Sequence, residues 1–305
     1  MTTRLGTKTT LEQTTPSLKG RIFNYSLVLI LSVIWGLAFV AIRRAEFELS
    51  AVNLTVLRWL IASGGFLLLA PKFGKPMMPV QRRHLPRIIL VSFASVVGYH
   101  LSLNYAETIV SSGLAGLLIS FAPIFVVVLS AFFLKEKIGG KLKLGLVMAI
   151  AGALILSFND IDFLQVTGPI AVILAAFMYS IFSVASKPLV KDYGALPTSI
   201  WVAAIGTLFT LPLISWQFFK QIVALSLVGW LSVIYLAILS TVVANMILYT
   251  LIGTRAVSRL SVQLYLVPLV SLAGGILLLG ESLTAFTIIG AAFLLGAVAL
   301  ATHKN

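Results

Sequence analysis

The sequence predicts an all-α integral membrane protein of ten transmembrane helices, built as two inverted five-helix repeats. Three observations lead to this fold class. Apolar residues make up 59% of the 305 residues and charged residues 10%, with a mean hydropathy of +1.07, values outside the range of soluble domains. The apolar residues gather in runs of about 20, the length that spans a bilayer. Landmark residues also recur at a fixed offset, so the second half of the chain repeats the first.

The internal repeat is marked by Pro123 and Pro268, which lie 145 positions apart, and by Trp35 and Tyr179, which lie 144 apart. A one-residue gap reconciles the two offsets. Each half has five apolar runs, an odd number, so the second half enters the membrane from the opposite side. The expected organisation is a disordered cytoplasmic tail at 1–22, a first five-helix repeat at 23–158 and a second at 165–302.

The spans are joined by short connections, so no soluble domain is inserted. They are expected at 23–42, 51–70, 87–105, 109–134, 139–157, 167–187, 198–216, 227–250, 258–280 and 284–302. The first run indicates a retained span rather than a signal peptide. Of the 22 Lys and Arg residues, 18 fall in the termini and connections of one side and 3 in those of the other. This asymmetry predicts a multi-pass protein of the cell inner membrane with both termini in the cytoplasm.

The composition argues against several other classes. The net charge of +13 would suggest nucleic acid as a partner of a soluble protein, but here the basic residues separate apolar runs and reflect membrane topology. Without cysteine, no disulfide or thiol-bound zinc is available, and the three histidines are scattered. No nucleotide-binding, hydrolase or metalloprotease motif occurs, so we expect neither an enzyme nor a cofactor or metal site.

The second span carries a charge at membrane depth. Arg58 lies about seven residues from the outer end, roughly 10 Å deep at the helical rise. A charge at that depth is unfavourable enough to need a reason. One interpretation is an arginine that snorkels to the outer headgroups, and the other is a structural pair with Glu107 or Glu281.

Polar residues at helical spacing mark one face of the third and of the eighth span. They are Ser92, Ser95, Tyr99 and Ser102, with His100 and Asn104 beside them, and Thr241, Asn245 and Tyr249. In a membrane such a face avoids lipid. Hydrogen bonds between helices would explain any single serine, whereas two stripes in equivalent helices favour a cavity wall.

Pro123 and Pro268 interrupt the fourth and ninth spans near their centres. A proline cannot donate to the carbonyl four residues back, so the carbonyls of Ile119 and Leu264 are expected to lack a helical partner. Such backbone is tolerated where it is buried in protein or lines a wet cavity. A packed kink is the alternative, but matched prolines in both halves favour a transporter binding site.

Glu136 and Glu281 each follow the last apolar residue of their span, which favours structural anchors over proton carriers. Without an Asp, Glu or Lys near the middle of any span, we expect exchange, or coupling through His100. The fifth and tenth spans show only Gly and Ala among aliphatic residues, and we assign them to packing or dimer contacts.

Together these features resemble the drug/metabolite transporter superfamily, and within it the ten-helix EamA-type exporters. The residues that carry the resemblance, within 23–302, are Trp35-Gly36, Leu57-Arg58-Trp59, Pro123, Glu136, Gly145, Pro268, Glu281 and Gly290. The resemblance implies export of amino acids, other metabolites or drugs. It also implies a central cavity lined by the first, third, fourth, sixth, eighth and ninth spans.

The favoured function is export or exchange of small amphiphilic metabolites, chiefly amino acids and aromatic ones among them, by alternating access. The aromatic candidates for the cavity wall are Trp35, Tyr99, Phe121, Tyr179, Tyr249 and Tyr265. A multidrug or cation exporter is the alternative, although the first span lacks an acid, and a channel or scaffold is the class outside transport. A sugar-phosphate carrier would need paired Lys or Arg in the membrane.

The expected site solvates a zwitterion with dipoles. The carbonyls of Ile119 and Leu264 would accept from the ammonium, and hydroxyl, amide and imidazole groups would donate to the carboxylate. The predicted substrate-binding residues are Trp35, Tyr99, His100, Ser120, Tyr179, Asn245 and Tyr265. Gating or structural roles are expected for Arg58, Pro123, Pro268, Glu136 and Glu281. The expected partners are a small-molecule substrate and the lipid bilayer, for a monomer or homodimer.

Overall fold

The computed structural model describes residues 18–73, 80–157, 166–280 and 285–302, and the regular structure of these residues is entirely helical. The α-helices are α1 (Leu18–Glu46), α2 (Ala51–Leu69), α3 (Leu85–Ser92), α4 (Ser102–Glu107), α5 (Ser112–Leu118), α6 (Ala122–Phe133), α7 (Gly140–Ser157), α8 (Thr167–Tyr193), α9 (Ala195–Thr210), α10 (Trp216–Ala224), α11 (Leu227–Ile234), α12 (Ala244–Thr254), α13 (Val257–Gln263), α14 (Leu266–Leu279) and α15 (Ala285–Thr302). Short 3₁₀ and π-helical segments join several of them. Helical segments occur in each of the ten predicted ranges.

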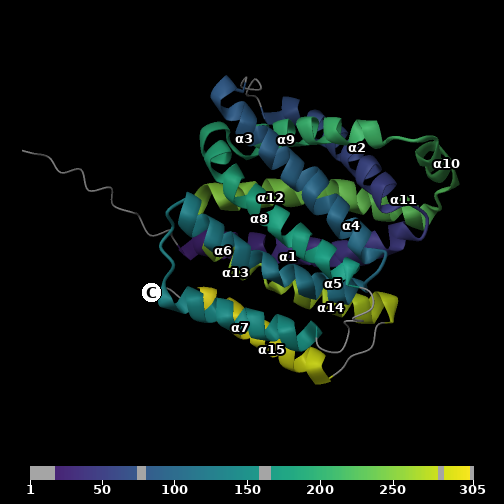
Figure 1. Ribbon diagram of the computed structural model, residues 1–305. Helices are drawn as coiled ribbons and strands as arrows, with labels where there is room; N and C mark the ends of the chain where they lie inside the picture. The colour runs from purple at the N-terminus through teal and green to yellow at the C-terminus, as the bar shows by residue number, and fades with distance from the viewer. Residues whose placement is uncertain (1–17, 74–79, 158–165, 281–284, 303–305) are drawn as a thin grey trace, which may run out of the picture.

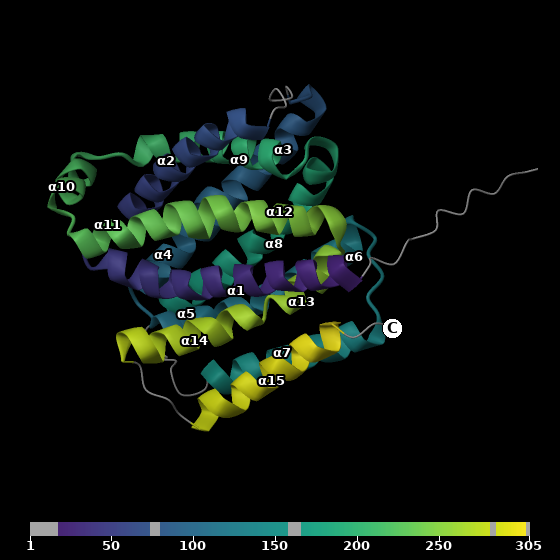
Figure 2. The ribbon, with the colours of Figure 1, turned by 180° about the vertical axis from the view of Figure 1, so that it is seen from behind.

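Among the described residues, eight helical stretches are long and apolar enough to cross a membrane. They are Ile22–Glu46, Ala51–Leu69, Arg82–Glu107, Ser112–Phe133, Thr167–Tyr193, Ala195–Leu213, Leu227–Thr254 and Val257–Leu278. The fifth and tenth predicted spans correspond to α7 and α15. These two helices pack on each other along one side of the bundle, as Figures 1 and 2 show.

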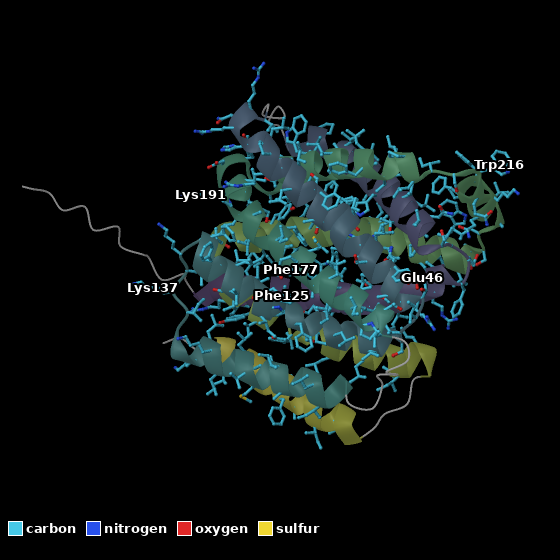
Figure 3. The ribbon with its side chains drawn as sticks, in the orientation of Figure 1. Glu46, Phe125, Lys137, Phe177, Lys191 and Trp216 are labelled. Atoms are coloured by element: carbon cyan, nitrogen blue, oxygen red, sulfur yellow. The ribbon has the colours of Figure 1, made fainter. Side chains whose placement is uncertain are left out.

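The long helices run roughly parallel to one axis, so the bundle has two ends. Figure 3 shows Lys137 and Lys191 at one end and Glu46 and Trp216 at the other. The N-terminal end of α1 and the C-terminal end of α15 lie at the Lys137 end (Figure 1). Both ends of the described chain therefore lie on the side where the sequence concentrates its basic residues.

The two central prolines interrupt their helices as predicted. In the fourth span α5 gives way to a 3₁₀ segment, η4 (Ile119–Phe121), before α6, and in the ninth span two residues separate the end of α13 from the start of α14. The prediction that two carbonyls lose their partners is wrong. The Ile119 carbonyl accepts from the Ala122 N–H, and the Leu264 carbonyl accepts from the Val267 N–H at 2.9 Å. A local 3₁₀ adjustment thus supplies the bond that proline removes.

Two π-helical segments that the sequence analysis did not predict occur in the third and eighth spans. They are η3 (Phe93–Leu101), between α3 and α4, and η6 (Tyr235–Val243), between α11 and α12. Side chains reinforce the wider turns, because His100 Nδ1 donates to the Ser95 carbonyl at 2.7 Å and the Thr241 hydroxyl to the Leu236 carbonyl at 2.8 Å. π-Helical turns are rare and are frequent at functional sites. Their equivalent positions in the two repeats indicate a paired feature of the fold.

Candidate functional site

A cavity lies at the centre of the bundle, between helices of both repeats. Its empty space amounts to about 800 Å³, counting the part open to solvent. It is walled by α1, α2 and α8, by the two spans with π-helical segments, and by the two spans interrupted by proline. This set contains the six spans that the resemblance implies, and α2 in addition. All seven residues predicted to bind substrate line it: Trp35, Tyr99, His100, Ser120, Tyr179, Asn245 and Tyr265.

Aromatic rings form a continuous part of the wall. The ring of Tyr179 contacts Trp35 edge-on at 5.9 Å between centroids, Tyr99 at 5.8 Å and Phe182 at 4.9 Å. Figure 3 shows the neighbouring contact between Phe125 of α6 and Phe177 of α8, whose ring centroids are 5.5 Å apart. The contacts of Tyr179 join α1, η3 and α8 into one apolar surface of the cavity, whereas Phe125 and Phe177 do not line it.

Two of the predicted aromatic wall residues do not line the cavity, and Phe182 lines it instead. Tyr249 is 1% exposed and packs in the core, because it follows the π-helical segment η6, which changes the register of the helix. Phe121 lies in the 3₁₀ segment η4, whose tighter turn places it on a different face from that of an unbroken helix. Both predictions assumed regular α-helical periodicity.

The predicted polar stripes are also divided by the π-helical turns. Ser95 and Tyr99 line the cavity, whereas Ser92 and Ser102 do not. The Asn104 side chain is fully buried and donates to the Thr55 hydroxyl at 2.9 Å, a bond that joins α4 to α2. The stripes therefore supply both cavity wall and contacts between helices.

His100 and its neighbours hold one polar region of the cavity. The His100 ring contacts Tyr99 at 4.8 Å and Trp59 at 5.2 Å between centroids. Because a carbonyl accepts from Nδ1, that nitrogen carries a proton, and Nε2 is the atom that can accept from a ligand or take up a proton. The indole N–H of Trp35 donates to the Ser240 carbonyl at 3.2 Å, which links α1 to η6.

Two buried hydroxyl groups of the cavity wall have no protein partner. The Ser120 side chain is 4% exposed and the Tyr265 side chain 1%, and neither hydroxyl oxygen forms a hydrogen bond within the protein. Buried polar groups are nearly always bonded, so an unpartnered pair at a cavity indicates room for water or a ligand. These residues come from the two proline-interrupted spans, one in each repeat.

Arg58 lines the cavity and is only 3% exposed, so the interpretation that it snorkels to the outer headgroups is wrong. Its Nε donates to the Thr241 hydroxyl at 2.8 Å and one terminal nitrogen donates to the Ser240 hydroxyl at 3.2 Å. Both acceptors belong to η6. Sequence reasoning missed this placement because the π-helical turn, which presents the two hydroxyls to α2, leaves no sign in the spacing.

Glu136 follows α6 by three residues, lies outside the cavity and bonds to the start of α13. Its carboxylate accepts from the N–H groups of Val257 and Ser258 at 3.0 and 3.1 Å, from the Ser258 hydroxyl at 2.6 Å and from the Lys187 ammonium at 3.3 Å. Burial alone would raise the pKa of Glu136, but these bonds lower it below its ordinary value. The contacts suit an anchor between helices. Its predicted counterpart, Glu281, lies outside the described residues.

Comparison with known proteins relates this chain to membrane transporters. The profile of the EamA-like transporter family matches residues 22–158 and again 166–302. An uncharacterized transporter of Archaeoglobus fulgidus is 31% identical over 280 residues, which cover 92% of this chain and 99% of that protein. A probable terminal-alkyne amino-acid exporter of Streptantibioticus cattleyicolor is 28% identical over 91% of this chain and 93% of its own length. A probable amino-acid metabolite efflux pump of Escherichia coli is 28% identical over 88% and 91%, respectively. A solved crystal structure shares the fold, with a TM-score of 0.72 at 21% identity over 92% of this chain and 96% of that one.

Proposed function

Because the chain belongs to the EamA-like transporter family, we propose that it exports or exchanges amino acids, aromatic ones among them, by alternating access around the central cavity. The observation that carries the proposal is the cavity itself. Its aromatic walls and few placed polar groups match the usual composition of small-molecule sites. Two relatives with names that specify amino-acid or amino-acid metabolite export support this substrate class.

The proposal includes ten spans in two inverted repeats, 23–158 and 165–302, with α7 and α15 as the fifth and tenth spans. Paired π-helical segments and paired proline interruptions at equivalent places support two repeats that share one architecture. An inverted pair gives a carrier two related conformations, each open to one side of the membrane. The conformational change would then rock the repeats around the cavity between them.

The orientation is tested by single cysteines, since the chain has none of its own. We expect Ser50→Cys and Thr108→Cys to react in intact cells with a maleimide that cannot cross the membrane. Lys137→Cys and Asp192→Cys should react only after the membrane is opened. All four positions are exposed in the structure, so failure to react reports the side of the membrane. Labelling of Lys137→Cys in intact cells would show that the termini are not cytoplasmic.

The site is tested by removing its polar groups one at a time. Tyr265→Phe deletes a hydroxyl, and Asn245→Ala deletes an amide that lines the same cavity. A hydrogen bond to a charged ligand group is worth roughly 1.5–3 kcal/mol, which is a loss of about 10- to 150-fold in affinity. We expect each variant to exchange labelled phenylalanine in proteoliposomes with a correspondingly higher half-saturation concentration.

The matched control is Tyr249→Phe, the same change at a buried tyrosine outside the cavity. It should exchange phenylalanine like the parent, and all variants should reach similar membrane abundance. If Tyr265→Phe and Asn245→Ala also behave like the parent, these two residues are not part of the binding site.

A further inference from the structure

The cavity wall holds a buried positive charge, the guanidinium of Arg58. Arg58 is buried at 3% exposure in the middle of α2 and lines the cavity. A guanidinium has five N–H donors, and two of them donate to the hydroxyls of Thr241 and Ser240. Hydroxyl groups solvate the cation but do not neutralise it. A charge in an apolar interior is strongly unfavourable unless an anion accompanies it.

None of the described residues that line this cavity is an Asp or Glu. The carboxyl group of Glu107 interacts with Arg58 electrostatically, but Glu107 lies at the end of α4 and does not line the cavity. Tyr99, Tyr235 and His100 also interact with the guanidinium, and none of the three is a carboxylate. The cavity surface is therefore cationic on the side of α2 and η6.

We propose that Arg58 binds the carboxylate of the transported molecule, which deepens the proposed function by naming a monocarboxylate as the substrate class. A guanidinium pairs with both oxygens of a carboxylate in a planar, two-bond arrangement. One such group balances one negative charge, which suits a monocarboxylate better than a phosphate dianion. Ser240 and Thr241 act as positioning residues, because their hydroxyls fix the orientation of the guanidinium.

The rest of the cavity provides neutral groups for the other parts of the molecule. The unpartnered hydroxyls of Ser120 and Tyr265 can accept hydrogen bonds from an ammonium, and the aromatic wall around Tyr179 can cover an apolar side chain. These dipoles are weaker partners for an ion than a charge of opposite sign. Affinity is therefore expected to depend on the carboxylate first and on the ammonium second.

The test uses three probes that differ in one group: phenylalanine, 3-phenylpropionate, which lacks the ammonium, and 2-phenylethylamine, which lacks the carboxylate. Binding to the purified full-length protein in detergent is measured by isothermal titration calorimetry at neutral pH. We expect phenylalanine to bind at least as tightly as 3-phenylpropionate, and both to bind about 10- to 150-fold more tightly than 2-phenylethylamine.

Arg58→Gln should abolish this preference, so that the carboxylate probes bind no better than the amine. Arg58→Lys keeps the charge but loses the planar pair of donors, and should restore part of the preference. Thr241→Val retains Arg58 and removes the acceptor of its Nε, which should reduce the preference while the protein stays folded. The control, Arg44→Gln, removes one charge at the exposed end of α1 and should leave the preference intact.

The outcomes separate this inference from the proposed function. If the carboxylate probes bind through Arg58 but the protein does not exchange phenylalanine in proteoliposomes, the proposed function is wrong and the inference about Arg58 is supported. If the protein exchanges phenylalanine, and 2-phenylethylamine inhibits this exchange as strongly as 3-phenylpropionate, the proposed function is supported and the inference about Arg58 is wrong. Failure of both carboxylate probes to bind the parent protein would also overturn it. A purely structural role of Arg58 would weaken all three probes equally, and that result contradicts the proposal as well.

Discussion

Glu136→Gln is expected to lower the free energy of unfolding by about 1.5–3 kcal/mol, the range for losing a hydrogen bond to a charged group. The carboxylate is 12% exposed and accepts four hydrogen bonds, from two backbone N–H groups, the Ser258 hydroxyl and Lys187. Glutamine keeps the shape but replaces one acceptor oxygen by a donor and removes the charge. Lys187 and the first N–H groups of α13 then lose their anionic partner.

The measurement is thermal unfolding of the purified variant in detergent, together with its abundance in the membrane. Glu48→Gln is the matched control at the other end of the bundle. The Glu48 carboxylate also accepts from a serine N–H and hydroxyl, both at 2.6 Å from Ser226, but this contact is exposed. Water can replace the hydrogen bonds of an exposed carboxylate, so Glu48→Gln should change the unfolding temperature far less. Equal effects of the two substitutions would mean that burial is not the reason Glu136 matters.

The pH dependence provides a second readout of the same contact. The hydrogen bonds and Lys187 lower the pKa of Glu136 in the folded state, although burial alone would raise it. A lowered folded-state pKa means that the stabilisation is fully present above the ordinary value of 4.5 and is lost as the pH falls through the folded value. The stability difference between the parent and Glu136→Gln should therefore be constant at neutral pH and shrink below about pH 4.5. A difference that persists unchanged at acidic pH would contradict the assignment.

The sequence was sufficient for the positions of the long apolar helices and for the seven predicted substrate-binding residues that line one cavity, although Phe121 and Tyr249 were wrongly placed in its wall. Apolar runs report spans directly, because a bilayer requires about 20 apolar residues in succession. The seven residues predicted for the site also converge, since matched prolines and polar positions in two repeats mark one pseudo-symmetric centre. The apolar runs and the matched residues each recur along the chain. An error of one or two residues at a single helix therefore does not change the predicted fold or the predicted cavity.

The features that the sequence did not reveal are local changes of helical pitch. The spacing of Ser92, Ser95 and Tyr99 fits an α-helix, yet η3 is a π-helix, and only the folded contacts select the wider turn. The same limitation affected Arg58, whose buried position depends on two hydroxyls of η6 in the other repeat. The recovered carbonyl bonds of Ile119 and Leu264 depend likewise on small backbone adjustments. The Arg58 bonds join segments far apart in the chain, and the carbonyl bonds need small changes of backbone angle. The spacing of residues in the sequence indicates neither.

Gly36→Ala is expected to destabilise the protein and slow transport together, because it separates two helices that wall the cavity. A β-carbon at this position of α1 would overlap Val270 Cβ and lie 2.9 Å from the Val267 carbonyl oxygen, both in α14. Carbon atoms in good contact are roughly 3.5–4.0 Å apart, so α1 and α14 must move by about an ångström. Overpacking of this kind typically costs about 1–3 kcal/mol, more than the roughly 0.5–1 kcal/mol that alanine gains over glycine within a helix.

Gly64→Ala in α2 makes the same substitution where no atom lies within 4 Å of the new β-carbon, and it isolates the gain in helix stability. We expect this control to unfold at a slightly higher temperature than the parent, and Gly36→Ala at a lower one. Because Trp35 precedes the substituted residue and Pro268 lies on α14, displacement of the two helices also widens the cavity. Phenylalanine exchange should then fall in Gly36→Ala even at temperatures where the variant stays folded. If the two alanine variants are equally stable and equally active, the close approach of α1 to α14 does not shape the transport site.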